Sequence, residues 1–584
     1  MDTPFRQNLA PDVSRPPPVV GGDPVARVLE LLRDGSHVRT QGLQGAARGY
    51  VLARLHRSLK APLVCIAPDE EAADALAHDL AFFLGGKGTP REPRVLRLPA
   101  DEVLPYDELS PDGEVVADRL GALFHLGQGT PAPALVLSLR GLLRKVLRPQ
   151  VMAELSERIR LGQDLDRDAL ALKLANMGYL SSPLVEDLGT FSVRGGLVDV
   201  FSPLYEKPVR LEFFGDTIES IRVFDPETQR TVDSLQEIIL LPAREVIFSE
   251  RTRANAEAAA RAVADRINLP TSKLRERLDA IREGLPGFGL EGLLPGFFEG
   301  GLGTVFDYLA AWSDTPLFYV DDPLGVERAA EELWVEVERS AQASDERQDL
   351  SHPPREHFLT WGEAREKLAG QRVLEGGGLS LTRDTASPVL FSFGTTQDVR
   401  EAILAHHGEE GALTPLIERL QRWRDARTPV AVACGTLSQA DRLKRLLLDR
   451  NLMVRVHSEP PGDPGTLYDP AIHAHLFTGE VSHGFVDGAG ALAVLSDEEI
   501  FGVRSRRRVR RSKSLDAFAA GFKDLKEGDL IVHTDFGIGR YAGLTKMQVN
   551  SVPGDFLVLE YAGKDKVYLP VGRMRLIQIG RAHV

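Results

Sequence analysis

Apolar residues in the first quarter of the chain follow two spacings that alternate. Segments with an apolar residue every three or four positions, such as 51–59 and 70–84, are separated by short runs of consecutive apolar residues, such as 62–68 and 134–139. The first spacing is typical of helices with one buried face, and the second of strands buried on both faces. Their alternation from residue 25 to residue 150 predicts a parallel β-sheet covered by helices.

The pattern changes after about residue 150. Between residues 180 and 241, apolar and polar positions alternate and turn residues separate the segments, which predicts a small α+β insertion rich in strands. Helical spacing resumes over 250–283, and a buried strand is expected at 315–322. Residues 348–356 are polar, contain two prolines and show no periodicity, so we expect a linker there.

Two further modules follow in the chain. The strand and helix pattern of 389–501 predicts a third α/β unit. Seven of the ten residues in 504–513 are basic. Beyond them, 528–578 is typical of an all-β module, and 556–571 predicts a hairpin whose turn lies at 562–565.

These patterns divide the chain into nine segments of a multidomain α/β protein. In chain order we expect a flexible leader (1–24), an α/β domain (25–150), an α+β insertion (151–243), a second part of the first domain (244–346), a linker (347–376), a third, small α/β domain (377–502), a basic linker (503–524), an all-β module (525–578) and a tail (579–584). That the tail is non-native is implied only by the family resemblance given below.

The composition fits a folded cytoplasmic protein. The net charge is −14, so any nucleic-acid binding has to be local. Cys65 and Cys434 are too few for a disulfide framework, and both lie in apolar runs typical of buried strands. The amino-terminal residues lack the apolar core of a signal peptide, and no apolar run reaches the roughly 18 residues that a membrane span needs.

Gly42 and Gly45 lie in a loop before a helix, which is the place of a phosphate-binding loop in α/β domains. A working loop has the pattern GxxxxGK[ST]: glycines let amides wrap the phosphates, the lysine reaches the terminal phosphates and the hydroxyl binds magnesium. Here Ala47, Arg48 and Gly49 stand at the Gly, Lys and Ser/Thr positions. We therefore predict a degenerate loop that no longer binds nucleotide.

Other candidate sites have simpler interpretations. Asp321 and Asp497 each end an apolar run, as magnesium-binding carboxylates do in nucleotide-binding domains. Neither has a lysine-bearing loop to supply the phosphate, so we expect buried strands with acidic ends. The pairs His473–His475 and His406–His407 have no recognisable third ligand nearby, and no metal site is predicted. No catalytic motif is apparent.

The basic run is a candidate DNA contact. Its arginines could bind phosphate groups with release of counterions, or they could form a solvated, self-repelling linker that keeps two domains apart. The sequence leaves both interpretations open. The arginines concerned are Arg506, Arg507, Arg508, Arg510 and Arg511.

The strand expected near residue 210 carries a candidate protein-binding face. Strand alternation places Arg210, Glu212 and Phe214 on one face and the intervening apolar residues on the other. If the apolar face is the core, Arg210 and Phe214 are exposed together, which is the composition of a binding hot spot. The alternative is that Phe214 packs under the following loop while Arg210 pairs with Glu212 or Asp216.

Two long segments resemble the Mfd family of bacterial transcription-repair coupling factors. Residues 194–246 resemble a segment that UvrB and Mfd share. Residues 528–544 and 556–578 resemble the RNA-polymerase-interacting module of Mfd, which is similar to CarD-type regulators. Together with 104–120 and the degenerate loop, the resemblance covers about residues 25 to 578. It favours Mfd over UvrB, because 104–120 leaves no room for the DNA-clasping hairpin of UvrB.

The resemblance implies a fold for each segment. Residues 25–150 and 244–346 correspond to UvrB-like domains 1a and 1b, which form a degenerate RecA-like unit. Residues 151–243 correspond to domain 2, the UvrA-binding α+β insertion, and residues 377–502 to domain 3. Residues 525–578 correspond to a CarD-like module with the fold of a Tudor or SH3-like β-barrel.

The resemblance also implies binding residues. The contacts to UvrA, a protein of nucleotide excision repair, map onto Arg194, Arg210, Phe214 and Asp216. The contacts to the β subunit of RNA polymerase map onto Leu544, Lys546, Met547 and Val549.

We therefore expect a two-ended adaptor for transcription-coupled DNA repair, without catalysis or a cofactor of its own. In the family, a DNA-translocating motor that uses ATP and magnesium follows this region, and we expect a truncated chain because the sequence stops at Val584. Upstream DNA is a further candidate partner, and no membrane partner is expected. Two rival functions are a weak ATPase or DNA-unwinding module formed by residues 25–345, and a CarD-like transcription regulator.

Overall fold

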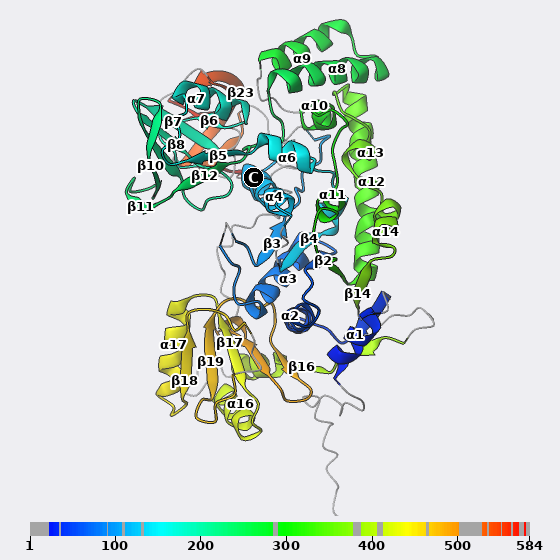
Figure 1. The fold of residues 1–584 in the computed structure, drawn as a ribbon, viewed down its shortest axis with the longest axis vertical. Helices are drawn as coiled ribbons and strands as arrows, with labels where there is room; N and C mark the ends of the chain where they lie inside the picture. The colour runs from blue at the N-terminus through cyan, green and yellow to red at the C-terminus, as the bar shows by residue number, and fades with distance from the viewer. Residues whose placement is uncertain are drawn as a thin grey trace, which may run out of the picture.

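The computed structural model describes residues 23–33, 37–89, 92–107, 111–129, 133–283, 290–377, 387–405, 413–462, 467–501, 528–533, 537–549, 552–561, 565–570 and 577–579. Most of the expected leader, the basic run and the last five residues lie outside these ranges. Figure 1 shows an elongated molecule with a central sheet, a helical hairpin at one end and a smaller sheet at the other.

The central sheet consists of seven parallel strands in the order β15-β1-β14-β13-β2-β4-β3. Residues 25–150 supply four of them, which confirms the predicted parallel sheet. The strands are β1 (His37–Gln41), β2 (Leu63–Ala67), β3 (Val95–Leu98), β4 (Ala134–Ser138), β13 (Leu317–Asp321), β14 (Arg372–Gly377) and β15 (Val389–Leu390). The helices nearest to them are α1 (Pro24–Arg33), α2 (Ala47–Leu59), α3 (Glu70–Phe83), α4 (Gly113–Gly127), α5 (Leu139–Leu143) and α12 (Pro323–Arg347).

Both faces of this sheet are buried. In β2, Cys65 contributes to the hydrophobic core on one face, while Val64 and Ile66 contribute to the core on the other. All five residues of β2 are buried, as are all five of β4. The consecutive apolar runs of the sequence therefore reflect burial on both sides.

The expected linker at 347–376 is corrected by the structure. It contains α13 (Pro354–His357), α14 (Trp361–Leu368) and most of β14, which lies inside the sheet between β1 and β13. The prolines of the expected linker begin a short helix, because proline is tolerated in the first helical turn. Strand β14 has only two consecutive apolar residues, so its sequence carries little signal for a buried strand.

The α+β insertion forms a separate six-stranded sheet in the order β11-β10-β9-β8-β7-β6. Its strands are β6 (Leu180–Ser181), β7 (Thr190–Arg194), β8 (Leu197–Val200), β9 (Val209–Phe214), β10 (Thr217–Phe224) and β11 (Thr231–Ser234). Strands β5 (Glu157–Arg160) and β12 (Glu237–Leu240) pair beside it, and α7 (Arg167–Asn176) supplies Leu170 and Leu174 to the core. This arrangement confirms the predicted strand-rich insertion.

Two buried arginines and two buried carboxylates connect the first domain to the residues that follow the last strand of the insertion. Arg119 of α4 pairs with Asp101 at 2.6 Å and with Glu245 at 2.7 Å. Arg144 lies 3.3 Å from the same Asp101 carboxylate and 3.5 Å from that of Glu245. Glu245 follows the last strand of the insertion, so this network fixes where the insertion leaves and rejoins the first domain.

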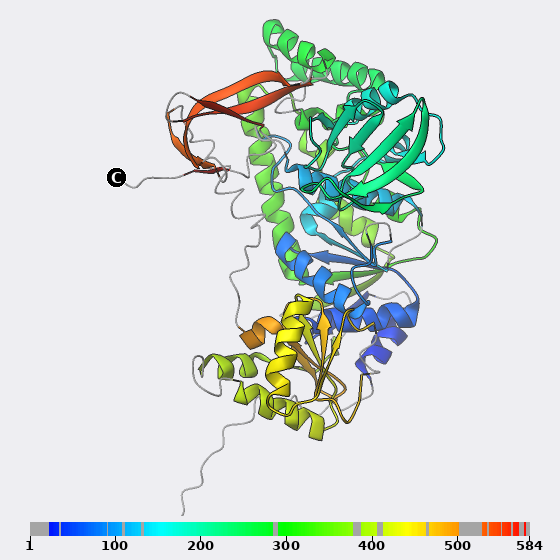
Figure 2. The same cartoon turned by 90° about the vertical axis from the view of Figure 1, so that its left-hand side faces the viewer.

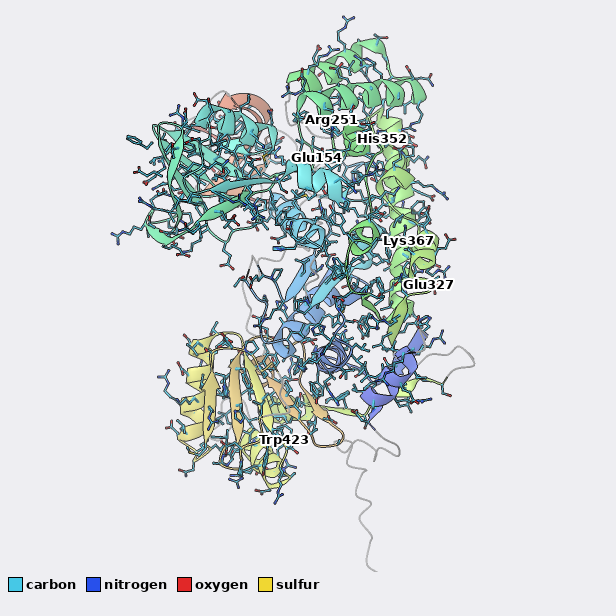
Figure 3. All side chains as sticks on the ribbon, viewed as in Figure 1. Glu154, Arg251, Glu327, His352, Lys367 and Trp423 are labelled. Atoms are coloured by element: carbon cyan, nitrogen blue, oxygen red, sulfur yellow. The ribbon has the colours of Figure 1, made fainter. Side chains whose placement is uncertain are left out.

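Helices form the end of the molecule beyond the central sheet. They are α6 (Pro149–Leu155), α8 (Glu250–Arg266), α9 (Thr271–Glu283), the short 3₁₀ helix η1 (Glu291–Leu293) and α10 (Leu294–Phe297). Helix α11 (Val305–Leu309) instead contributes to the core on one face of the central sheet. Figure 3 shows Glu154 of α6 near Arg251 of α8, and the two form an ion pair at 3.1 Å. No helix in the described ranges is long and apolar enough to cross a membrane.

Residues 393–501 form the third α/β unit. Its predicted start is corrected, because Val389 and Leu390 form β15 of the central sheet and pair with β1. Its sheet has the order β16-β20-β21-β17-β19-β18, and the central strand β17 is buried along its whole length. The strands are β16 (Phe393–Thr395), β17 (Val430–Cys434), β18 (Val454–His457), β19 (Ala474–Thr478), β20 (Phe485–Asp487) and β21 (Ala493–Ser496). The helices are α15 (Gln397–Ala405), α16 (Thr414–Asp425), α17 (Leu437–Leu448) and α18 (Asp497–Phe501).

The last described module is a five-stranded antiparallel sheet in the order β25-β24-β23-β22-β26, which Figure 2 shows in red and orange. Its strands are β22 (Leu530–His533), β23 (Gly537–Val549), β24 (Val552–Glu560), β25 (Lys566–Pro570) and β26 (Ile577–Ile579). Strands β24 and β25 pair as the predicted hairpin. Closure of this sheet into a barrel stays a prediction.

Candidate protein-binding faces and a remnant nucleotide loop

The loop predicted to be a degenerate phosphate loop connects β1 to α2, and three of its backbone amides already donate hydrogen bonds. Arg48 N–H donates to the carbonyl of Gly45, and Ala47 N–H donates to that of Gln44, both at 3.2 Å. Ala46 N–H donates to the carbonyl of His483 in the third α/β unit at 3.1 Å. A working loop would present such amides to phosphate.

The side chain of Arg48 points to the carboxylates of the first domain. It forms a close ion pair with Asp321 at the end of β13, and its second terminal nitrogen lies 3.8 Å from Asp79 of α3. Tyr319 donates its hydroxyl to Asp321 at 3.0 Å. Burial raises the pKa of Asp321, and the Arg48 charge opposes that rise. Asp321 thus ends a buried strand, as predicted, and the guanidinium of Arg48 neutralises its carboxylate.

The Ser/Thr position of the loop has no space for a side chain. A Cβ atom on Gly49 would lie 2.7 Å from the backbone carbonyl carbon of Asp79, because α2 and α3 pack closely there. Gly45 has a positive φ of 52°, and its Cβ would lie 3.0 Å from that of His483. A serine or threonine therefore does not fit at residue 49 while α2 and α3 pack in this way.

The third α/β unit covers this loop, and Figures 1 and 2 both place its yellow strands beside α2 and α3. Ser482 donates its backbone N–H and its hydroxyl to the two oxygens of Asp79, each at 2.7 Å. Phe485 packs against Tyr50 and Phe83, with ring centroids 5.6 and 6.1 Å apart. Residues of both domains belong to one hydrophobic core.

Both cysteines, as well as His473 and His475, are buried within the folded domains. Cys65 and Cys434 are buried free thiols, and burial raises the pKa of both. His473 bonds to Arg424 and to the backbone N–H of Met453, and His475 bonds to His457 at 3.0 Å. The described ranges hold no group of three side chains placed to bind a metal ion. The His406–His407 pair lies outside them.

Asp497, the second acidic residue considered for magnesium binding, ends the buried strand β21. Its carboxylate accepts a hydrogen bond from the backbone N–H of Gly435 at 3.3 Å. It therefore connects two neighbouring strands of the third unit, as expected for an acidic strand end.

Phe214 is exposed at the end of β9 in the insertion. Its residue is 78% exposed, so the alternative in which it packs under the following loop is wrong. Leu211, on the opposite face, is fully buried, which confirms the predicted orientation of the strand. The turn that follows has Gly215 at a φ of 62° and an exposed Asp216.

Neither environment predicted for Arg210, exposure to solvent or a pair with Glu212 or Asp216, is correct. Its side chain is only 19% exposed, and it pairs with Asp199 through two hydrogen bonds of 2.7 and 2.8 Å rather than with Glu212 or Asp216. Asp199 lies directly opposite Arg210 in the β8–β9 pair. Glu212 instead pairs with Arg222 of β10 at 2.7 Å.

Arg194 of β7 binds the same carboxylate. It donates to Asp199 at 2.5 Å, and its own side chain is exposed. The predicted residues Arg194, Arg210 and Phe214 therefore share one face of the insertion's sheet, and Asp216 lies in the turn at its end. The sequence interpretation missed Asp199, although a single acidic residue between Val198 and Val200 in a buried strand was a signal.

The candidate polymerase-binding residues all fall in β23. Lys546 is opposite Asp555 and Met547 opposite Gly554 in the pairing with β24. The side chains of Leu544, Lys546, Met547 and Val549 lie outside the described part of the structure, as do the five arginines of the basic run.

Two family models match parts of the chain. The model described as UvrB interaction domain matches residues 158–246, which include the face formed by Arg194, Arg210 and Phe214. The model described as CarD-like/TRCF RID domain matches residues 525–580, the terminal antiparallel module.

Individual proteins match almost the whole chain. This chain is 72% identical over 559 residues to the transcription-repair-coupling factor of Myxococcus xanthus. The aligned residues make up 96% of this chain and 46% of that relative. This chain is also 28% identical to the transcription-repair-coupling factor of Escherichia coli and 26% identical to that of Bacillus subtilis, each over 551 residues. Each alignment covers 92% of this chain and 44% of the relative. The chain therefore spans about half the length of the curated relatives it matches.

Proposed function

Because this chain corresponds to the amino-terminal 46% of transcription-repair-coupling factors, we propose that it acts as a two-ended adaptor in transcription-coupled DNA repair. One end is the module at 525–580, which binds the β subunit of RNA polymerase. The other end is the insertion at 158–246, which recruits UvrA. Such a factor acts where transcription and repair meet, in the cytoplasm.

The observation that carries the proposal is the face of the insertion. An exposed Phe214 beside two arginines has the composition of a protein-binding hot spot, since aromatic and arginine side chains dominate such sites. This face lies within the match to the UvrB interaction domain. Arg194, Arg210, Phe214 and Asp216 are therefore our candidates for the UvrA contact.

The arrangement of domains supports the same function. We propose that the central sheet is a degenerate RecA-like unit built from domains 1a and 1b, and that the third α/β unit is domain 3. The terminal sheet would close into a Tudor-like barrel that presents Leu544, Lys546, Met547 and Val549 to the polymerase. Upstream DNA is proposed as a further partner of the basic run.

The rival ATPase function has little support from the geometry of the loop. Three loop amides are engaged in hydrogen bonds, and the arginine at the lysine position is paired with Asp321. The rival CarD-like function involves the terminal module alone. It does not explain why the insertion matches the UvrB interaction domain.

A bridging experiment tests the adaptor. Immobilised β subunit should retain UvrA only when the 584-residue chain is added. Phe214→Ala should release UvrA while the chain itself stays bound to the β subunit. Failure of the wild-type chain to retain UvrA, together with an effect of the chain on promoter opening, would favour the CarD-like function instead.

A further inference from the structure

One buried carboxylate holds both arginines of the proposed UvrA face. Asp199 is 1% exposed and accepts three hydrogen bonds: two from Arg210, at 2.7 and 2.8 Å, and one from Arg194, at 2.5 Å. It lies below the surface, where a docked protein cannot touch it. It nevertheless sets where two guanidinium groups lie.

Arg210 is held from three directions. Beyond Asp199, its Nη2 donates to the side-chain oxygen of Gln229 at 3.1 Å, and its guanidinium carbon lies 4.5 Å from the centre of the buried Phe224 ring. Gln229 is itself fixed, because its amide donates to the carbonyl of Pro226 at 2.8 Å. These contacts use Nε and Nη2, and among the described residues no acceptor takes a hydrogen bond from Nη1. The Nη1 group of Arg210 can therefore donate to an acceptor of a bound partner from a position that is fixed before binding.

The register of the sheet places these groups together. Asp199 is opposite Arg210 across β8 and β9, and opposite Ser192 across β7 and β8. Arg194 is two residues beyond Ser192 on β7, so it points to the same face. Phe214 is four residues beyond Arg210 on β9 and shares this face as well. A charged cluster from β7, β8 and β9 and the exposed ring of Phe214 thus lie on one face of the sheet.

We infer that Asp199 is the positioning residue of the UvrA-binding face, and this inference rests on the proposed function. Two arginines side by side repel each other and lose side-chain freedom when a partner fixes them. A buried carboxylate between them removes most of the repulsion and fixes both side chains before binding. Preorganisation of this kind raises affinity without adding a contact.

Asp199→Asn is the direct test. Asparagine keeps the size of the side chain but presents an amide N–H₂ to one arginine in place of an acceptor, so the two-point bond to Arg210 is lost. We expect at least a tenfold weaker complex with UvrA in a titration with the 584-residue chain. Glu237→Gln is the control, because Glu237 also holds two arginines, Arg158 and Arg160, but in the separate β5–β12 sheet rather than in the six-stranded sheet that carries this face. Its affinity for UvrA should equal that of the wild type.

A double-mutant cycle separates positioning from a general loss of structure. If Asp199 acts through Arg210, then Asp199→Asn should cost little further affinity in an Arg210→Ala background. It should still add to the loss caused by Phe214→Ala, which is a separate contact. Equal additional losses in both backgrounds would mean that Asp199 supports the fold in general and would overturn the inference.

A second variant covers the case in which Asp199→Asn does not fold. Gln229→Asn shortens the other side chain that holds Arg210, and asparagine tolerates the left-handed backbone at this position, where φ is 58°. It should weaken UvrA binding severalfold, and only when Arg210 is present. Unchanged affinity in both variants, with a wild-type chain that binds UvrA, overturns the positioning role alone. A wild-type chain without affinity for UvrA overturns the proposed function.

Discussion

The guanidinium of Arg48 forms an ion pair with the carboxylate of Asp321, across the place where a nucleotide-binding domain holds phosphate and magnesium. Arg48 stands at the position of the lysine of such a site and Asp321 at that of the metal-binding carboxylate, and the two charges neutralise each other. Asp79, which accepts two hydrogen bonds from Ser482, extends this arrangement to the third α/β unit. The loop before α2 thus lies at an interface between two domains.

Restoring the consensus loop should not restore nucleotide binding. The triple variant Ala47→Gly, Arg48→Lys, Gly49→Thr recreates GxxxxGK[ST], but a threonine at residue 49 collides with Asp79 and the third unit still covers the loop. Titration with a fluorescent ATP analogue and magnesium should show no saturable binding up to about 1 mM, the range of weak ligands. Tight, magnesium-dependent binding by the wild type that is lost in Arg48→Ala would contradict this account.

The burial of Asp79 should make stability depend on pH. Burial raises the pKa of Asp79 to about 6, while Arg48, Ser482 and His483 oppose the rise. Since the folded value exceeds the unfolded value, the stability associated with this group is full at low pH. It falls as the pH rises through the folded pKa, by up to about 3 kcal/mol.

Asp79→Asn isolates this effect, because asparagine is never charged. The melting temperature of the variant relative to the wild type should rise between pH 4 and pH 7. Asp74→Asn is the control and should show no such trend, because Asp74 lies on the same helix as Asp79 but forms an exposed ion pair with Arg97 of β3. A constant difference between Asp79→Asn and the wild type over this range would show that Asp79 is ionised throughout.

Glu245 should be among the most sensitive positions for stability. Removing it leaves the buried Arg119 and Arg144 with Asp101 as their shared partner, and loss of one member of a buried ionic network costs about 3 kcal/mol or more. Urea denaturation of Glu245→Ala should show this loss. Glu336→Ala breaks an exposed pair with Arg140 and should cost less than about 1 kcal/mol. Similar losses in the two variants would contradict the role of the buried network.

Much of the architecture could be predicted from local pattern. The run from Leu63 to Ala67 indicated a strand buried on both faces, and it lies in the centre of a parallel sheet. Alternation in β9 predicted that Phe214 lies on the face opposite Leu211 but left open whether it packs under the following loop, and the structure shows it exposed. Both inferences succeeded because they depend on the period of a single element.

Contacts between distant segments could not be predicted in this way. Asp79 and Ser482 are 403 residues apart, and neither segment carries a motif for the other. The pairing of Arg210 with Asp199 depends on the register between two strands, whereas the sequence offered Glu212 and Asp216 as nearer acceptors. Strand β14 was mistaken for part of a linker because its place in the sheet is decided by its neighbours β1 and β13.

Met547→Arg should abolish binding to the polymerase β subunit. An unpaired charge placed in an apolar contact costs several kcal/mol, which is enough to lose a micromolar complex of about 8 kcal/mol in practice. The circular dichroism spectrum and UvrA binding of the variant should match those of the wild type. Unchanged retention by immobilised β subunit would place the contact elsewhere on the module.

The central claim is that the face around Phe214 recruits UvrA, and calorimetric titration of UvrA into the 584-residue chain tests it most directly. The wild-type chain should bind without ATP or DNA. Phe214→Ala should weaken the complex by about 2 kcal/mol or more, roughly thirtyfold, as expected for a hot-spot aromatic. Val232→Ala, which removes another exposed apolar side chain of the same insertion, should leave the affinity unchanged. No binding by the wild type, or equal losses in the two variants, would contradict the account.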